Sequence, residues 1–335
     1  GKNDMNLKEI TTDKSFDYKY LYRRILPYAR PYVFRIILGL VIAIPVGLLD
    51  AVVAFSLKPY MDYVIVKKNA ILAALIPISV ILFAIIQGVL KYLNNYLNDW
   101  SGKKITNDIR KDLFKKLLSL EPSFYDMNSS GIIINRFSDD AKTASQGLID
   151  NIKEVISTIC ASISLIGVLI YNSWQLAFIA VFVLGSSMLP MHLIRKKVKF
   201  VSHESMKVGS EVLTHFNETS SGNKIINSYN LQDYQYKKFD KKINEDFSLA
   251  MKLTKSVGWT SPLMYFIASC GIAIVMWYGN HLIINNQISS GSFLSFVTSL
   301  LLLYKPIKTL GRTLASMQTN FVAMNRIFNI LDIEP

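Results

Sequence analysis

Three lysines lie inside or beside long apolar stretches of this chain, where a charged side chain is costly. They are Lys153, Lys305 and Lys308. Charges in such places are usually paired or functional, and a group of lysines is suited to bind an anion. The alternative is that each lysine extends along the apolar surface toward water or pairs with an acid, such as Glu154 beside Lys153.

Motifs for other kinds of chemistry are missing from the sequence. The four histidines form no metal-ligand cluster, and the two cysteines, Cys160 and Cys270, are expected to be apolar packing residues rather than a disulfide. The sequence has no glycine-rich phosphate loop ending in Gly-Lys-Ser or Gly-Lys-Thr. We therefore expect no catalytic residue, no metal site and no cofactor in this chain itself.

The elements that position the lysines are four long blocks in which Asp50 is the only charge, at 36–57, 69–90, 155–194 and 256–304. A helix needs about 20 apolar residues to cross a membrane, so the last two blocks, with polar turns near their middles, provide two crossings each. The sequence therefore predicts an all-α membrane protein with six transmembrane helices. The expected spans are about 33–57, 70–97, 151–171, 174–198, 256–281 and 290–312.

The distribution of Lys and Arg predicts the orientation of these spans. Most of the 37 basic residues lie in the polar segments 1–35, 98–150 and 195–255, whereas Lys58, Lys67 and Lys68 alone fall in the opposite turns. Because basic loops are retained in the cytoplasm, both termini are expected there, in a bacterial inner membrane. This bias accounts for the net charge of +13, so no nucleic-acid partner is expected.

Two of the polar segments, 98–154 and 195–255, contain few helix-breaking residues. Apolar residues recur at helical spacing in the first of them, at Ile105, Ile109, Leu113, Leu117 and Leu120. Each segment has one central group of turn-forming residues, at 121–131 and at 217–223. We therefore expect two tall hairpins that continue out of the membrane. A transporter driven by a cytoplasmic motor needs such stalks, whereas a channel does not.

The N-terminal region is expected to have two parts. Residues 18–30 are basic and aromatic, which suits an amphipathic helix on the inner leaflet, although a soluble tail is the alternative. Residues 1–15 are expected to be a disordered tail or an artificial extension.

From about Tyr18 to its end, the chain resembles the transmembrane domain of type I ABC exporters. The motifs that carry this resemblance are Arg110 to Phe114, Pro122 to Asp126, Asn135 to Asp140, Gly279 to Leu282, Lys305 to Leu310 and Asn325 to Asp332. Within that family, the stretches Gln87 to Leu93, Asn172 to Leu176 and Lys305 to Lys308 are most similar to the bacterial lipid A flippases.

The resemblance implies a homodimer in which the two cytoplasmic breaks are coupling helices that contact nucleotide-binding domains. The nucleotide-binding domain would hold ATP and Mg²⁺ and hydrolyse ATP, and residues 331–335 are expected to begin the linker to that domain. The residues expected to make the coupling contacts are Ser123, Phe124, Tyr125 and Asp126 in the first break, and Asn217, Glu218, Thr219, Ser220, Ser221 and Gly222 in the second.

The resemblance also assigns the cationic residues to substrate binding. Basic residues that match Lys153 and Lys308 contact lipid phosphates in the flippases, and Lys305 lies three residues before Lys308. Where those proteins have a third arginine this chain has Gln87, with Lys91 one turn later, which leaves open whether its cargo is lipid A.

The leading functional hypothesis is an ATP-driven exporter that flips an amphipathic, anionic lipid by alternating access. A multidrug or peptide exporter on the same scaffold is the first alternative. A motor-free channel or a regulatory membrane subunit is the second.

Overall fold

The computed structural model describes residues 17–334, so the prediction for residues 1–15 lies outside the described residues. Every element in the described part is helical, without a strand. The chain forms two compact units. Unit 1 comprises residues 1–174 and 285–335, and unit 2 comprises residues 175–284.

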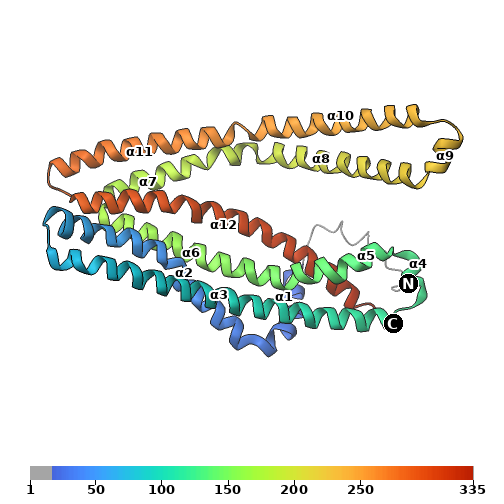
Figure 1. The fold of residues 1–335 in the computed structure, drawn as a ribbon, viewed down its shortest axis with the longest axis horizontal. Helices are drawn as coiled ribbons and strands as arrows, with labels where there is room; N and C mark the ends of the chain where they lie inside the picture. Colours follow the sequence, from blue (N-terminus) through green and yellow to red (C-terminus); the bar gives the residue numbers. More distant parts are fainter. Residues whose placement is uncertain (1–16, 335) are drawn as a thin grey trace. The chain divides into compact units, whose positions relative to one another are not determined.

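Unit 1 contains four long helices and several short ones (Figure 1). Two turns of π-helix, η4 and η5, lie between α5 and α6. In chain order the elements of unit 1 are α1 (Tyr18–Ala29), η2 (Arg30–Tyr32), α2 (Val33–Pro59), η3 (Tyr60–Val66), α3 (Ala70–Ser119), α4 (Pro122–Met127), α5 (Ser130–Asn135), η4 (Arg136–Asp140), η5 (Thr143–Gly147), α6 (Leu148–Asn172) and α12 (Ser290–Leu331). Helix α12 packs along α6 and α2, and α2 also packs against α3 and α6.

Six helical segments among residues 17–334 are long and apolar enough to cross a membrane. Each predicted span lies within one of them. The most apolar stretch of α3 has no buried residue, and Ile71 in its first turn is 76% exposed. An apolar surface of this extent is unfavourable in water and favourable in lipid. The segments are Tyr18–Val66, Ala70–Ser119, Ser130–Asn172, Trp174–Ser221, Gln232–Ile284 and Ser290–Leu331.

The main core of unit 1 lies in its polar half, where α1, α3 and α12 meet. The predicted stripe on α3 is confirmed, because Ile105, Ile109 and Leu113 are all fully buried there. The helix predicted at 18–30 is also confirmed, as α1. Its two buried residues, Leu21 and Ile25, pack against protein, whereas the idea that α1 lies on a leaflet stays a prediction.

The first predicted break is confirmed as a helix–turn–helix between α3 and η4. Pro122 occupies the first turn of α4, where its missing N–H costs no hydrogen bond. Ser129 caps α5 by accepting a hydrogen bond from the backbone N–H of Ile132. The chain therefore reverses direction through two short helices of six residues each.

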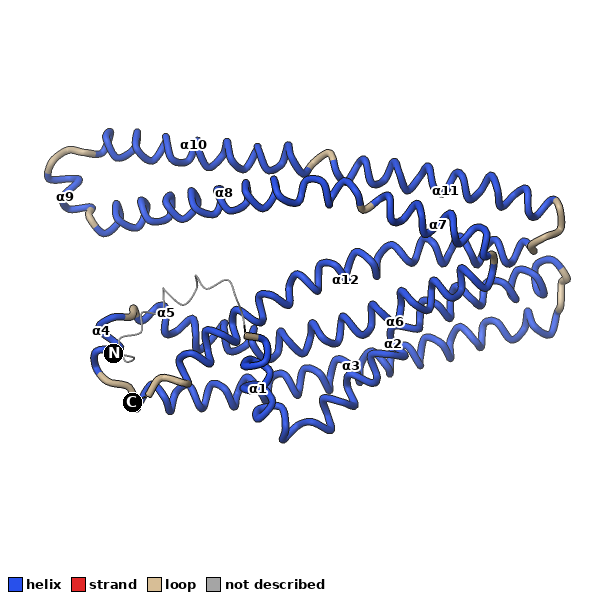
Figure 2. The backbone as a smooth tube through the Cα atoms, turned by 180° about the vertical axis from the view of Figure 1, so that it is seen from behind, coloured by secondary structure: helices blue, strands red, loops and turns tan. Residues whose placement is uncertain are grey.

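Unit 2 is a helical hairpin (Figures 1 and 2). It consists of α7 (Trp174–Ser187), α8 (Leu189–Ser221), α9 (Asn223–Ser228), α10 (Gln232–Val257) and α11 (Thr260–Ile284). The predicted spans 174–198 and 256–281 are each interrupted once, at Met188 ahead of Pro190 and at Gly258 and Trp259. Helix α8 packs along α10, and α11 contacts α8.

The second break lies later in the chain than predicted. Residues 217–221 continue α8 to its end, and the reversal runs from Gly222 through α9 to Leu231. Asn230 has a positive φ of 54°, a conformation that asparagine tolerates better than most residues. The polar stretch at 217–221 stays helical because such residues permit a helix end without requiring one.

Candidate functional site

A polar cavity of about 450 Å³ lies in unit 1 among α3, α6 and α12. Its lining contains both cations and acids, together with hydroxyl and amide groups. The lining residues are Asp99, Asp150, Asn151, Lys153, Glu154, Thr309, Arg312, Thr313 and Ser316. The cavity is large enough for a headgroup-sized ligand.

Lys153 is the one predicted substrate-binding residue that lines this cavity. It lies on α6, and its Nζ donates a hydrogen bond to Oδ1 of Asn95 on α3, at 3.0 Å. This bond crosses between two helices and holds the lysine at the cavity wall. The ammonium group keeps two further protons with which to bind a ligand.

Gln87 and Lys91 lie on α3, upstream of the cavity. The residues Gln87, Lys91, Asn95 and Asp99 follow one another at intervals of four, so they form one stripe on that helix. Gln87 is half-buried and Lys91 is exposed, and neither lines the cavity. The stripe leads from the apolar part of α3 to Asn95, the partner of Lys153.

Lys305 and Lys308 are exposed on α12, one turn before the cavity. Lys308 lies 6.0 Å from the centre of the Tyr304 ring. The cation of α12 that does line the cavity is Arg312, four residues after Lys308. Sequence reasoning did not select Arg312, although this spacing of four placed it on the same face as Lys308.

Three acids share the cavity with these cations. Asp99 lies on α3, while Asp150 and Glu154 lie on α6, one turn apart. Oδ1 of Asp150 is buried and has no hydrogen-bond partner among the described residues. The cavity lining alone has more acids than cations and is therefore not a simple anion site. Cations are in excess only when Lys91, Lys305 and Lys308 beside the cavity are included.

The predicted coupling residues of the first break divide into one buried and three accessible side chains. Phe124 is 3% exposed and packs in the core of unit 1, so it holds α4 in place. Tyr125 and Asp126 are exposed, and Ser123 is half-buried. The Tyr125 hydroxyl donates to the carbonyl of Leu117. The residues able to contact a partner are therefore those next to Phe124.

The predicted coupling residues of the second break occupy the end of α8. Asn217, Glu218, Ser220 and Ser221 are exposed, while Thr219 and Gly222 are half-buried. The tip of unit 2 is instead formed by α9 and residues 229–231. Sequence reasoning missed α9, although Asn223, Asn227 and Asn230 mark a region rich in turn-forming residues.

Three segments that are far apart in sequence meet in one ionic cluster of unit 1. Arg136 and Asp140 form a buried ion pair at 2.9 Å, and Arg326 of α12 lies 3.6 Å from Asp140. Arg110 of α3 donates to the carbonyls of Phe137 and Ser138. Burial lowers the pKa of Arg136, and the Asp140 carboxylate opposes that shift. The cluster links α3, η4 and α12, and on α12 it lies beyond the cavity toward the C-terminus.

Residues 36–307 match the family model of the ABC transporter transmembrane region. The chain is 27% identical to an ATP-dependent lipid A-core flippase of Syntrophus aciditrophicus, over 94% of this chain and 52% of that protein. It is 26% identical to the flippase of the same name in Desulfotalea psychrophila, over 95% of this chain and 55% of that protein. The chain thus spans about half the length of these relatives.

Proposed function

Because this chain belongs to the family of ABC transporter transmembrane regions, we propose that it is the substrate-translocating domain of an ATP-driven exporter. The chain is an integral membrane protein, with six helical segments among residues 17–334 suited to span a bilayer. Its cargo, in this proposal, is an amphipathic lipid with an anionic headgroup. The similarity to proteins named lipid A-core flippases supports this substrate class.

The observation that carries the proposal is the group of cations around the α3–α6–α12 cavity. Lys153 and Arg312 line it, and Lys91, Lys305 and Lys308 are exposed one or two helical turns toward the apolar half. A lipid whose chains lie along the exposed apolar helices would place its phosphate among these side chains. Charge-assisted hydrogen bonds to phosphate are strong in such a partly apolar setting.

The motor would be a nucleotide-binding domain that holds ATP and Mg²⁺, on the same polypeptide or on another. In this proposal the exposed side chains of α4 and of the α9 tip contact such a domain. Their location at the polar end of each hairpin supports this role. Two copies of the chain would enclose one translocation pathway. Tighter binding of ATP to one conformation would then drive the change from inward-facing to outward-facing.

The acids of the cavity favour a second candidate, an exporter of cationic drugs or peptides. Asp99, Asp150 and Glu154 would attract a cationic amphipath as readily as Lys153 and Arg312 attract a phosphate. The two candidates differ in which side chains the cargo needs.

The test is ligand-stimulated ATP hydrolysis by the protein joined to its motor domain in lipid nanodiscs. We expect anionic lipopolysaccharide-type lipid to stimulate hydrolysis. We expect Lys153→Ala and Lys308→Ala each to weaken the half-maximal response about tenfold, the loss typical of one charge-assisted hydrogen bond.

Lys115→Ala is the matched control, because Lys115 is exposed on α3 and does not line the cavity. An unchanged lipid response in both lysine variants would contradict the anionic cargo. Stimulation by a cationic amphipath that is lost in Asp99→Asn would instead support the second candidate.

A further inference from the structure

A histidine occupies a packing position between the two long helices of unit 2. On α8, Val201, Val208 and His215 follow one another at intervals of seven, and all three are buried. The first two are apolar residues of the kind expected at such a seam. His215 is 7% exposed and lies 6.0 Å from the ring of Phe239 on α10. Apolar packing therefore does not account for an imidazole at this position.

Neither ring nitrogen of His215 has a hydrogen-bond partner within the described part of the chain. An imidazole carries at least one N–H donor, and leaving it buried and unpaired is costly. A ligand that accepts this proton would remove that cost.

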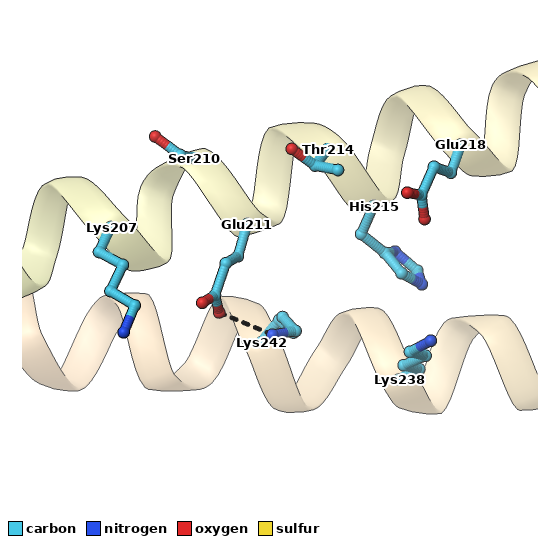
Figure 3. Close-up of a pocket in the computed structure, with 8 residues that line it drawn as sticks. All are labelled: Lys207, Ser210, Glu211, Thr214, His215, Glu218, Lys238 and Lys242. Atoms are coloured by element: carbon cyan, nitrogen blue, oxygen red, sulfur yellow. Dashed lines mark hydrogen bonds and ion pairs between the residues drawn. The ribbon is translucent and has the colours of Figure 1, made fainter. Parts of the chain in front are cut away.

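His215 lies in a cavity of about 500 Å³ between α8 and α10 (Figure 3). The lining side chains are Lys207, Ser210, Glu211, Thr214, His215, Glu218, Lys238 and Lys242. A second cavity of about 200 Å³ shares His215, Glu218 and Lys238 and continues to the α9 tip. Its wall there is partly apolar and includes Ile225, Ile226 and Leu231.

The charges of the larger cavity leave a cationic excess beside His215. Glu211 and Lys242 pair with each other at 2.7 Å, so neither is available to balance another group. Their bond lowers the pKa of Glu211 and raises that of Lys242. Lys207 and Lys238 remain, opposed by the single carboxylate of Glu218. A metal ion does not suit this lining, and within residues 17–334 no group of His, Cys, Asp and Glu is arranged to hold one.

We propose that this cavity binds the phosphate group of a small soluble molecule. His215 and Lys238 donate to the phosphate oxygens from the two facing helices. The neighbouring cavity, with Ile225 and Leu231, accommodates an apolar part of the same molecule. This site is separate from the proposed cargo site of unit 1 and does not depend on the identity of the cargo.

The position of His215 on α8 argues for a soluble phosphate rather than a lipid headgroup. The fourth predicted span ends near residue 198, which is 17 residues before His215. At about 1.5 Å per residue, the histidine lies roughly 25 Å from the end of that span. A headgroup in the leaflet does not extend this far.

The test is an NMR titration of the full chain in nanodiscs with isotope-labelled histidine. The His215 signal is assigned by its loss in His215→Asn. Inorganic phosphate is expected to shift this signal saturably, and phenyl phosphate is expected to do so at lower concentration because it also fills the apolar part. Lys238→Gln is expected to weaken both about tenfold, as for the loss of one charged donor.

Two matched variants control for general effects. Lys237→Gln changes the exposed lysine next to Lys238 on α10. His203→Asn changes an exposed histidine on α8, the helix that carries His215. Both are expected to leave the affinity unchanged. Lys238→Arg is expected to retain binding. Unchanged signals of His192 and His281 establish that each variant is folded.

Three results would overturn the proposal. The first is no saturable shift of His215 with either soluble phosphate. The second is equal weakening in Lys238→Gln and Lys237→Gln. The third is a His215 signal that differs between phosphatidylglycerol and phosphatidylcholine nanodiscs when no soluble phosphate is present. That result would assign the site to lipid.

Discussion

Gly47 shows how one residue sets the distance between two spanning helices. A Cβ atom at Gly47 of α2 would lie 2.3 Å from the carbonyl oxygen of Ser157 and 2.9 Å from Cβ of Cys160, both on α6. Small residues allow such close approach, and in lipid this packing is a main source of helix association. Backbone atoms are in the way, so no side-chain rotation relieves the clash.

Gly47→Ala is therefore expected to separate α2 from α6 and to lower stability by about 1–3 kcal/mol. Thermal unfolding in detergent micelles measures the change. Gly167→Ala on α6 is the control, because nothing lies within 4 Å of a Cβ there. That variant is expected to be neutral or slightly stabilising, since alanine favours a helix more than glycine does. Equal loss of stability in both variants would contradict the steric explanation.

At the scale of elements, two side-chain hydrogen bonds hold α1 and η2 against α3, one from each element. Tyr28 donates to Asp112 at 2.6 Å, and Tyr32 donates to Asp108 at 2.5 Å. The pKa of Tyr28 is raised mainly by burial and next by its hydrogen bond to Asp112. The pKa of Tyr32 is raised mainly by its hydrogen bond to Asp108. Near the middle of α1, Arg24 forms an ion pair at 3.0 Å with Asp332 at the end of α12.

The raised tyrosine pKa values predict that α1 is released at alkaline pH. A detached tyrosine ionises near pH 10, whereas the docked tyrosine keeps its proton to a higher pH. The docking energy is thus fully present below about pH 10 and is lost as the pH rises further. Spin labels on Arg23→Cys and Thr319→Cys, in a chain without Cys160 and Cys270, measure the separation of α1 from α12.

The Tyr28→Phe, Tyr32→Phe double variant is the control for this pH effect. It is expected to show a smaller change in label separation above pH 10, because its phenyl rings carry no proton to lose. The same alkaline transition in the variant and the parent would rule out these two tyrosines as its cause.

For the whole molecule, the distribution of the basic residues predicts the orientation in the membrane, which can be measured directly. Single cysteines at Lys67 and at Asn227, in a chain whose two native cysteines are serine, report on opposite ends of the spans. A membrane-impermeant maleimide is expected to label position 67 in intact cells. Position 227 is expected to react only after permeabilisation, because basic segments stay in the cytoplasm. The reverse pattern would invert the proposed topology.

The sequence by itself determined the class of fold, the six spans and the spacing of the α3 stripe. A span can be recognised from its own residues, because a charged side chain in lipid is costly and long spans therefore contain almost no charge. The stripe of Ile105, Ile109 and Leu113 was readable for the same reason, because helical periodicity reveals which face of a helix is apolar. The lysines near the spans were visible through their contrast with these surroundings.

Only the tertiary structure decided which residues meet. It placed Arg312, rather than Lys305 or Lys308, in the cavity with Lys153, and it joined Arg136 and Asp140 of η4 to Arg326 of α12. It also turned unit 2 at residues 222–231 and buried Phe124 and His215. Periodicity tells which face is buried but not what that face touches. The partner of a side chain depends on residues far away in sequence, whose approach is set by the packing of whole helices.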